Sequence, residues 1–259
     1  MTPNFEAASS QTPHQATTNG SERSLDETQA IFLPVSTGFP LADNDRPSWR
    51  GWIHTGVLPV VIACGVLLIV FADGAAGKVA ASIFFASSFL LFGNSALYHR
   101  FNWKPRVKLA LKRIDHANIV LLIAGSYTPM TMLALPFEKG LPLLIIVWST
   151  ALLGMGFRVL WVHAPRWLYV PIYIAMGASA LIYVVDFYQA NQWMMILIGA
   201  GGALYIAGAI VYGLKKPNPF PKHFGFHEIF HAFTVLAFLC HWTAALLICL
   251  NPLQGSFAG

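Results

Sequence analysis

The run HEIFHAFTVLAFLCHWTAALLICL, residues 227–250, is apolar over most of its length but begins with two histidines. A helix needs about 20 residues to cross the hydrocarbon of a bilayer, so this run predicts a membrane-spanning helix. His227 and His231 are four residues apart and therefore lie on one helical face, where both imidazoles can reach one metal ion. Ionisable residues at such a depth are costly in lipid and are typical of functional sites.

The overall composition is that of a membrane protein. Of the 259 residues, 56% are hydrophobic and 10% are charged, and the mean hydropathy is +0.59, whereas soluble domains carry about 25% charged residues. The isoelectric point near 9.2 does not indicate a nucleic-acid partner, because the basic residues lie at the ends of apolar runs rather than on a soluble face. Cys64, Cys240 and Cys249 lie inside apolar runs and show neither a disulfide framework nor a zinc ribbon.

Seven apolar runs predict an all-α fold, an integral membrane bundle of seven transmembrane helices. The runs cover Trp52–Phe71, Val79–Tyr98, Ile114–Leu135, Leu141–Leu160, Trp167–Val185, Met194–Leu214 and His227–Leu250. We expect a disordered polar tail over residues 1–47, a transmembrane domain over 48–250 and a short external tail over 251–259. Small residues between Gly199 and Gly208 follow no strand and predict close helix packing rather than a phosphate loop.

The distribution of lysine and arginine predicts the orientation in the membrane. With seven spans, the connections alternate between two sides, and one side carries thirteen basic residues: Arg46, Arg50, Arg100, Lys104, Arg106, Lys108, Lys112, Arg113, Arg158, Arg166, Lys215, Lys216 and Lys222. The connections on the other side carry Lys78 and Lys139. Because cytoplasmic loops are enriched in lysine and arginine, we predict a multi-pass protein of the cell membrane with a cytoplasmic amino end and an external carboxyl end.

Further polar residues are expected at the same membrane boundary as the histidine pair. Ser95 and His99 end the second run, one helical turn apart, and Asp115 begins the third. Three neutral imidazoles, from His99, His227 and His231, with one open position make a catalytic type of zinc site. Asp115 could orient the water at such a metal and accept its proton, and Ser95 could hydrogen-bond that water or a substrate carbonyl.

Four short motifs carry a family resemblance: Ser95-Ala-Leu-Tyr-His99, Arg113-Ile-Asp115-His116, Ser126-Tyr-Thr-Pro129 and His227-Glu-Ile-Phe-His231. In their order and placement they resemble the haemolysin III family, which belongs with the progestin and adipoQ receptors and the alkaline ceramidases. The resemblance covers residues 48–250. It implies a seven-helix fold with the amino end inside, Zn²⁺ held by the three histidines, and Asp115 and Ser95 serving the metal-bound water.

The start of the first run departs from that family. Many relatives have Glu-x-x-Asn-x-x-Thr-His there, and this chain has Pro47-Ser-Trp-Arg-Gly-Trp-Ile-His54, in which only the histidine matches. His54 has two interpretations, support of the site or contact with lipid headgroups. His116 points about 100° away from Asp115 on a helix, so it is not included in the site. His241 lies roughly 15 Å deeper than His231 and is more simply a buried hydrogen-bonding residue.

The leading functional hypothesis is a zinc-dependent, ceramidase-like hydrolase of lipid amide or ester bonds at the inner leaflet, with membrane lipids as partners. A lipid carbonyl can reach a metal at this boundary laterally, without leaving the bilayer. The alternatives are a receptor or membrane-homeostasis sensor with a structural zinc, and a haemolysin-type cytolytic protein, which would need a polar path through the whole bilayer. His227-Glu228-x-x-His231 also matches the zincin protease pattern with Glu228 as general base, but no second protease motif accompanies it.

Overall fold

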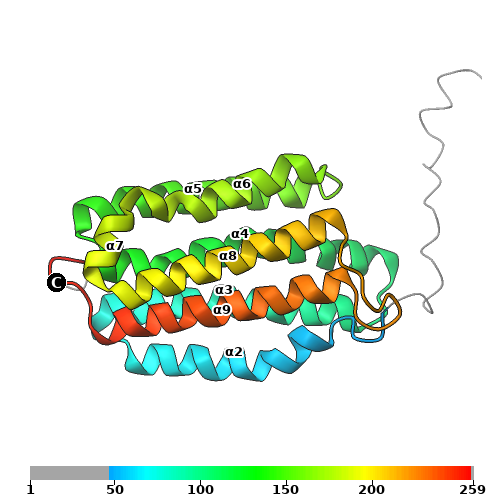
Figure 1. Ribbon diagram of the computed structural model, residues 1–259, viewed down its shortest axis with the longest axis horizontal. Coiled ribbons are helices and arrows are strands. Elements are labelled where there is room, and N and C mark those ends of the chain that lie inside the picture. The colour runs from blue at the N-terminus through cyan, green and yellow to red at the C-terminus, as the bar shows by residue number, and fades with distance from the viewer. Residues whose placement is uncertain (1–46, 258–259) are drawn as a thin grey trace, which may run out of the picture. The chain divides into compact units, whose positions relative to one another are not determined.

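The computed structural model of the protein describes residues 47–257, and all regular secondary structure in that range is helical (Figure 1). In chain order the helices are α2 (Trp52–Phe71), α3 (Gly74–Arg100), α4 (Pro105–Ala134), α5 (Phe137–Leu160), α6 (Arg166–Ala178), the 3₁₀ helix η2 (Ser179–Tyr183), α7 (Val184–Ala190), α8 (Gln192–Leu214) and α9 (Phe226–Leu250). Seven spans in the described range are long and apolar enough to cross a membrane, with Trp167–Ala190 as a single span. The predicted all-α, seven-helix membrane bundle is confirmed.

Several helices extend further into polar sequence than the apolar runs do. α2 coincides with its predicted run, but α3 begins at Gly74 rather than Val79, and α4 begins at Pro105 rather than Ile114. Pro105 stands at the first helical position, where the missing N–H would have no helical partner in any case. Hydropathy does not reveal these additional turns, because residues that leave the hydrocarbon no longer need to be apolar.

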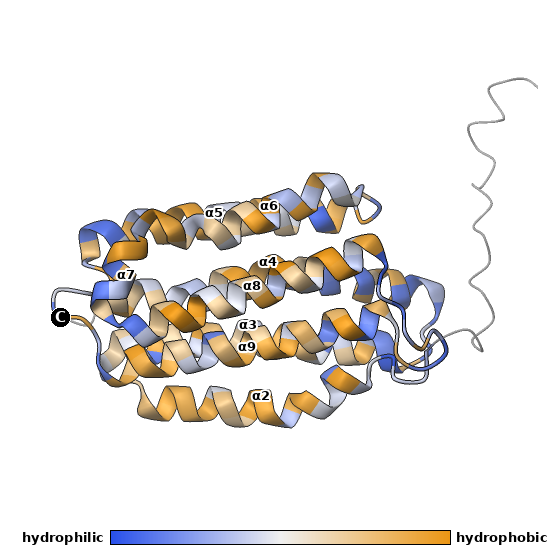
Figure 2. Ribbon diagram, in the orientation of Figure 1, coloured by the Kyte–Doolittle hydropathy of each residue, from blue (hydrophilic) through white to orange (hydrophobic). Residues whose placement is uncertain are grey.

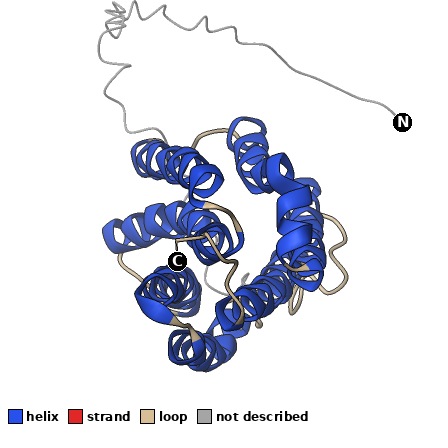
Figure 3. Cartoon of the chain, turned by 90° about the vertical axis from the view of Figure 1, so that its left-hand side faces the viewer, coloured by secondary structure: helices blue, strands red, loops and turns tan. Residues whose placement is uncertain are grey.

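The spans lie side by side, and their hydrophilic residues are concentrated towards the two ends of the bundle (Figure 2). α4 is the central helix: it packs against α3, α5 and α9, and most of its apolar segment is buried inside the protein. α8 packs closely against α9, and α2 packs against α3 and α9. Figure 3 looks at one end of the bundle and shows the loops that join the helices there.

The predicted basic loops gather at one end of the bundle. The backbone N–H of Ser48, just before α2, donates to the carbonyl of Lys222 in the α8–α9 loop at 3.0 Å. The Arg100 guanidinium, at the end of α3, lies over the Trp52 ring, 4.4 Å from its centroid. These contacts agree with the prediction that the three connections share one side of the membrane. That this side is the cytoplasmic one stays a prediction.

The two predicted tails have different outcomes. The amino-terminal tail over residues 1–47 lies outside the described residues, apart from Pro47. Residues 251–257 pack back onto the bundle, because the Leu253 N–H donates to the Leu133 carbonyl at 2.8 Å and the Phe257 ring lies 4.7 Å from that of Phe137. The carboxyl-terminal segment therefore covers the α4–α5 connection.

The fifth span is not one continuous α-helix, because α6 passes into η2 before α7 begins. Tyr127 of α4 satisfies backbone groups at this break: its hydroxyl donates to the Gly177 carbonyl at 2.6 Å and accepts from the Ala180 N–H at 2.8 Å. In lipid, each such backbone group needs a partner inside the protein. The motif Ser126–Pro129 therefore places a side chain that supports the irregular span.

Glycine allows α8 to approach α9 closely. A Cβ atom at Gly201 would collide with the imidazole of His241. That ring is held in place by a 2.8 Å hydrogen bond between Nδ1 and the Ala237 carbonyl. The contact confirms close helix packing by the small residues of α8, and it shows His241 as the buried hydrogen-bonding residue that the sequence suggested.

Glu228 fixes the start of α9. Its Oε2 accepts a hydrogen bond from the Gly225 N–H at 2.9 Å, and its Oε1 accepts one from Arg50 Nε at 2.6 Å. The residue is only 1% exposed. A carboxylate in the first turn is also favoured by the helix dipole. Glu228 thereby both caps α9 and binds the segment that precedes α2.

Glu228→Gln is expected to lower the stability of the protein. Glutamine keeps the shape and can still accept from Gly225, but it removes the charge that neutralises Arg50. We expect a loss of about 1–3 kcal/mol in the free energy of unfolding, because the pair is buried on one side only. The measurement is the thermal midpoint of the purified protein in detergent. Glu138→Gln, at an exposed acid in the first turn of α5, is the control, and equal midpoints for both variants would contradict this role.

Candidate metal centre

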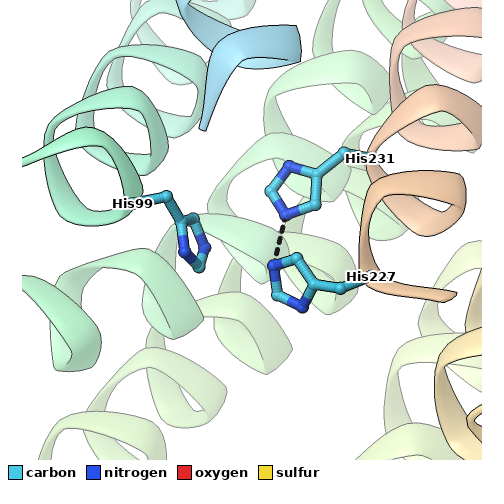
Figure 4. Close-up of side chains that lie close together, drawn as sticks. All are labelled: His99, His227 and His231. Atoms are coloured by element: carbon cyan, nitrogen blue, oxygen red, sulfur yellow. Dashed lines mark hydrogen bonds between the residues drawn. The ribbon is translucent and has the colours of Figure 1, made fainter. Parts of the chain in front are cut away.

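Three histidines from two helices converge at the end of the bundle that carries the basic loops (Figure 4). His99 comes from the last turn of α3, and His227 and His231 come from the first two turns of α9. One ring nitrogen from each lies within 4.8 Å of the others. The Nε2 atoms of His227 and His231 are 2.7 Å apart, as the dashed line in Figure 4 marks. The structure therefore brings together the three residues that the sequence predicted as metal ligands.

The donor set fits a transition-metal ion. Four tetrahedral ligands at about 2.0–2.1 Å from zinc would lie roughly 3.3–3.4 Å apart, so three nitrogens within 4.8 Å of one another need only small rotations to share an ion. Imidazole nitrogens suit zinc, copper, iron and nickel, whereas calcium and magnesium prefer oxygen ligands. Two of the rings are half-buried and His231 is buried, which limits exchange with solvent.

His54 of α2 contacts the imidazole of His231 on the side away from His227. Both ring nitrogens of His54 lie 2.9 Å from His231 Nδ1, and His54 is only 2% exposed. An edge-on contact with the Phe92 ring, 4.9 Å between centroids, holds His54 in turn. With Nδ1 engaged in this way, His231 presents Nε2 to the centre. Of the two interpretations left by the sequence, the structure places His54 against the site.

Asp115 lies beside the histidines on the central helix α4. Its Oδ2 atom is 3.9 Å from His99 Nε2, and its carboxyl group has the Ser95 side chain as a hydrogen-bond partner. Ser95 is itself only 3% exposed. The two residues that the sequence grouped with the histidines are thus adjacent to them, and Ser95 contacts the carboxyl group of Asp115.

The carboxylate of Glu228 makes its contacts away from the three histidines and Asp115. Both of its carboxylate oxygens are engaged, one by Arg50 and the other by the start of α9. In the zincin pattern the glutamate faces the metal as a general base. Because Glu228 caps α9 instead, the contacts argue against a zincin protease. The absence of a second protease motif in the sequence argues in the same direction.

A cavity of about 950 Å³ opens beside the three histidines. Residues from every helix of the bundle, from α2 to α9 and including η2, contribute to its wall, together with the loop between α5 and α6. One face of α4 lines it from Lys108 to Met130, which is roughly 33 Å of helix. Away from the polar end, the α4 lining includes Ile119, Leu122 and Ile123. The cavity is long enough and apolar enough to admit a hydrocarbon chain.

One buried residue of this cavity was not predicted as part of a site. The sequence counted Arg158, near the end of the fourth run, among the basic residues of the following connection, but it lies in the last turn of α5 and is only 1% exposed. Its neighbours come from two other helices: His116 of α4, at 2.5 Å, and the ring of Tyr169 in α6, at 4.1 Å. No spacing along the chain indicates this grouping, because it depends on how three helices pack.

Most of the chain is similar to known proteins. A family model described as Haemolysin-III related matches residues 43–242. The chain is 35% identical over 190 residues to the hemolysin-3 homolog of Bacillus subtilis (strain 168), which covers 72% of this chain and 86% of that protein.

Two further relatives extend the comparison. The chain is 33% identical over 175 residues to hemolysin-3 of Bacillus cereus, covering 66% of this chain and 76% of that protein. It is 26% identical over 184 residues to an adiponectin receptor protein of Drosophila melanogaster, covering 64% of this chain and 41% of that protein. With its seven spans and its polar motifs brought together at one end, the chain belongs to the haemolysin III family.

Proposed function

We propose that the protein is a zinc-dependent hydrolase of lipid amide or ester bonds, acting at the inner leaflet of the membrane. The observation that carries this proposal is the meeting of three histidines and a carboxylate at the polar end of a long apolar cavity. A site of this kind admits a lipid from the membrane and presents its polar linkage to the histidines. Membrane lipids are therefore the proposed partners.

His99, His227 and His231 would hold the metal, and Asp115 and Ser95 would handle the proton. When bound, zinc polarises carbonyl oxygens and acidifies water at its open position. Asp115 lies beside His99 and lines the cavity, so its carboxylate can accept a proton from a water that attacks the lipid carbonyl. Ser95 hydrogen-bonds Asp115 and so orients the carboxylate that accepts this proton.

A structural role for the metal is the second candidate, and one observation favours it. The ligands come from α3 and α9, which otherwise meet through the contacts of Phe84 and Phe92 with Phe238, deeper in the bundle. A metal would therefore join two helices, as a receptor or membrane sensor could require. One of the relatives is named an adiponectin receptor protein, which supports a receptor as the alternative function. The two candidates differ in whether losing a ligand abolishes folding or only turnover.

Removing any one of the three ligands is expected to remove the metal. The wild-type protein should carry about one zinc per chain, and His99→Ala, His227→Ala and His231→Ala should each fall below roughly a tenth of that, because a site with two protein ligands binds weakly. Elemental analysis of the purified proteins measures this.

His223→Ala, at an exposed loop histidine beside Ser48, is the control and should keep its metal. Wild-type protein without stoichiometric metal would overturn the proposal. Metal in the wild type, no hydrolysis, and loss of folded protein in His99→Ala would favour the structural role.

Asp115→Asn is expected to keep the metal and lose hydrolysis. Asparagine matches the shape of the carboxylate but accepts a proton poorly, so turnover of ceramide or lysolipid should fall by about 10²–10⁴-fold. Release of fatty acid in mixed micelles measures turnover, and elemental analysis confirms the metal. Asp73→Asn, at an exposed acid before α3, should leave turnover unchanged, and an active Asp115→Asn would remove Asp115 from the mechanism.

His54→Ala is expected to weaken metal binding although it removes no ligand. The contact with His231 Nδ1 orients that ring, and losing such a partner typically costs about 10–100-fold in metal affinity. Competition with a zinc chelator measures the affinity. An unchanged affinity in folded His54→Ala would show that His54 does not orient the ligand.

A further inference from the structure

Arg158 is a buried cation without a complete set of partners. It lies in the last turn of α5, is 1% exposed and lines the cavity. One terminal nitrogen, Nη2, lies 2.5 Å from His116 Nδ1, and the guanidinium carbon lies 4.1 Å from the centroid of the Tyr169 ring. Its other two nitrogens, Nε and Nη1, are buried and have no hydrogen-bond partner.

Such an arrangement is costly unless something neutralises it. A buried cation needs a counter-charge, and each buried donor without an acceptor carries a desolvation penalty. The ion pairs of Arg50 with Glu228, of His99 with Asp115 and of Lys139 with Asp186 do not include Arg158. His116 and Tyr169 supply contacts but no formal negative charge.

A second unsatisfied group lies near the same guanidinium. The Tyr173 hydroxyl is buried without a hydrogen-bond partner and lines the same cavity. Tyr173 follows Tyr169 by one helical turn on α6, and its ring lies 5.5 Å from the Tyr169 ring that Arg158 contacts. Hydrogen-bond donors without acceptors, from Arg158 on α5 and Tyr173 on α6, thus lie at one part of the cavity wall.

The charges along this end of the cavity have one predominant sign. Arg50, Lys108, Lys112 and Arg158 line it, and Asp115 is the single carboxylate among the described lining residues. Arg50 already has its partner in Glu228. Lys108 and Lys112 lie one turn apart on the lining face of α4, within two turns of Asp115. The cavity therefore combines an apolar length with a cationic end.

We propose that Arg158 and Tyr173 bind the phosphate of an anionic lipid whose hydrocarbon chain lies in the cavity. The phosphate oxygens accept from Arg158 Nε and Nη1 and from the Tyr173 hydroxyl, and they supply the missing negative charge. This inference deepens the proposed function by naming a class of lipid, and it rests on that function only in that the cavity holds a lipid.

The position of Arg158 also limits the shape of that lipid. Its partner His116 directly follows Asp115 in the chain, and their Cα atoms are about 3.8 Å apart. The anionic group is therefore bound at the histidine end of the cavity rather than at its far end. We expect the preferred lipids to carry their phosphate at the same polar end as the amide or ester linkage.

Binding of uncleavable lipids tests this without requiring turnover. The probes are a 1-O-alkyl glycerol phosphate and the 1-O-alkyl glycerol with the same chain, which differ only in the phosphate and contain no carboxylic ester or amide. Native mass spectrometry of the full-length protein in neutral detergent gives the ratio of their affinities. We expect the phosphate lipid to bind wild type roughly 10–100-fold more tightly, as for a charge-assisted contact in a buried site.

Variants assign the preference to these residues. In Arg158→Gln the ratio should fall to about one, whereas Arg106→Gln, the same change at an exposed position outside the cavity wall, should keep it. Tyr173→Phe removes one hydroxyl and should reduce the ratio several-fold. If Arg158→Gln does not fold, the proposal is still tested by the affinity ratio of the wild type and by its decrease in Tyr173→Phe.

Two further arms identify the source of the anion. Orthophosphate that binds wild type as tightly as the phosphate lipid would overturn the lipid assignment, and a free fatty acid that binds more tightly than the phosphate lipid would do the same. Equal affinity of wild type for the two ether lipids, or an unchanged ratio in folded Arg158→Gln, would overturn the proposal. Because no probe is cleaved, these results stand apart from any failure of the hydrolysis assays.

Discussion

The structure depends on one constraint: polar groups placed at membrane depth must find their partners inside the protein. His231 shows how this is achieved, since one of its ring nitrogens contacts His54 and the other faces His227. Tyr127 does the same for the backbone of the broken fifth span. Both cases join helices that are distant in sequence, so the polar contacts determine which helices are neighbours as well as what the site contains.

The central helix α4 is where these requirements meet. It carries Asp115 beside the histidines, His116 against Arg158, and Tyr127 at the break in the fifth span. All three lie on a helix that is buried over most of its apolar length. Polar side chains on several faces of α4 each need a partner inside the protein, because lipid cannot supply one. This explains why α4 is surrounded by α3, α5 and α9.

Much of the fold could be predicted from the sequence, because lipid imposes a simple rule on length and polarity. The seven spans, the shared side of the basic loops and the convergence of His99 with His227 and His231 follow from where apolar runs begin and end. The contact of His54 with His231 required the structure, because a histidine at the start of a span meets either lipid headgroups or protein, and only helix packing decides between them.

The burial of Arg158 was missed for a related physical reason. An arginine at the end of an apolar run normally extends to the interface, and the sequence gives no sign that α4 and α6 enclose this one. The break in the fifth span was likewise hidden, since residues 179–183 are as apolar as a regular helix. In both cases the information lies in a neighbouring helix, not in the local pattern.

The contact of Gly201 with the His241 ring has a consequence for the history of the family. Because there is no room for a side chain at position 201 while an imidazole occupies position 241, the two positions are not free to change one at a time. A lineage that gains a larger residue on α8 must first, or at once, acquire a smaller one on α9. We expect these two positions to covary among relatives, as a paired substitution across the helix interface.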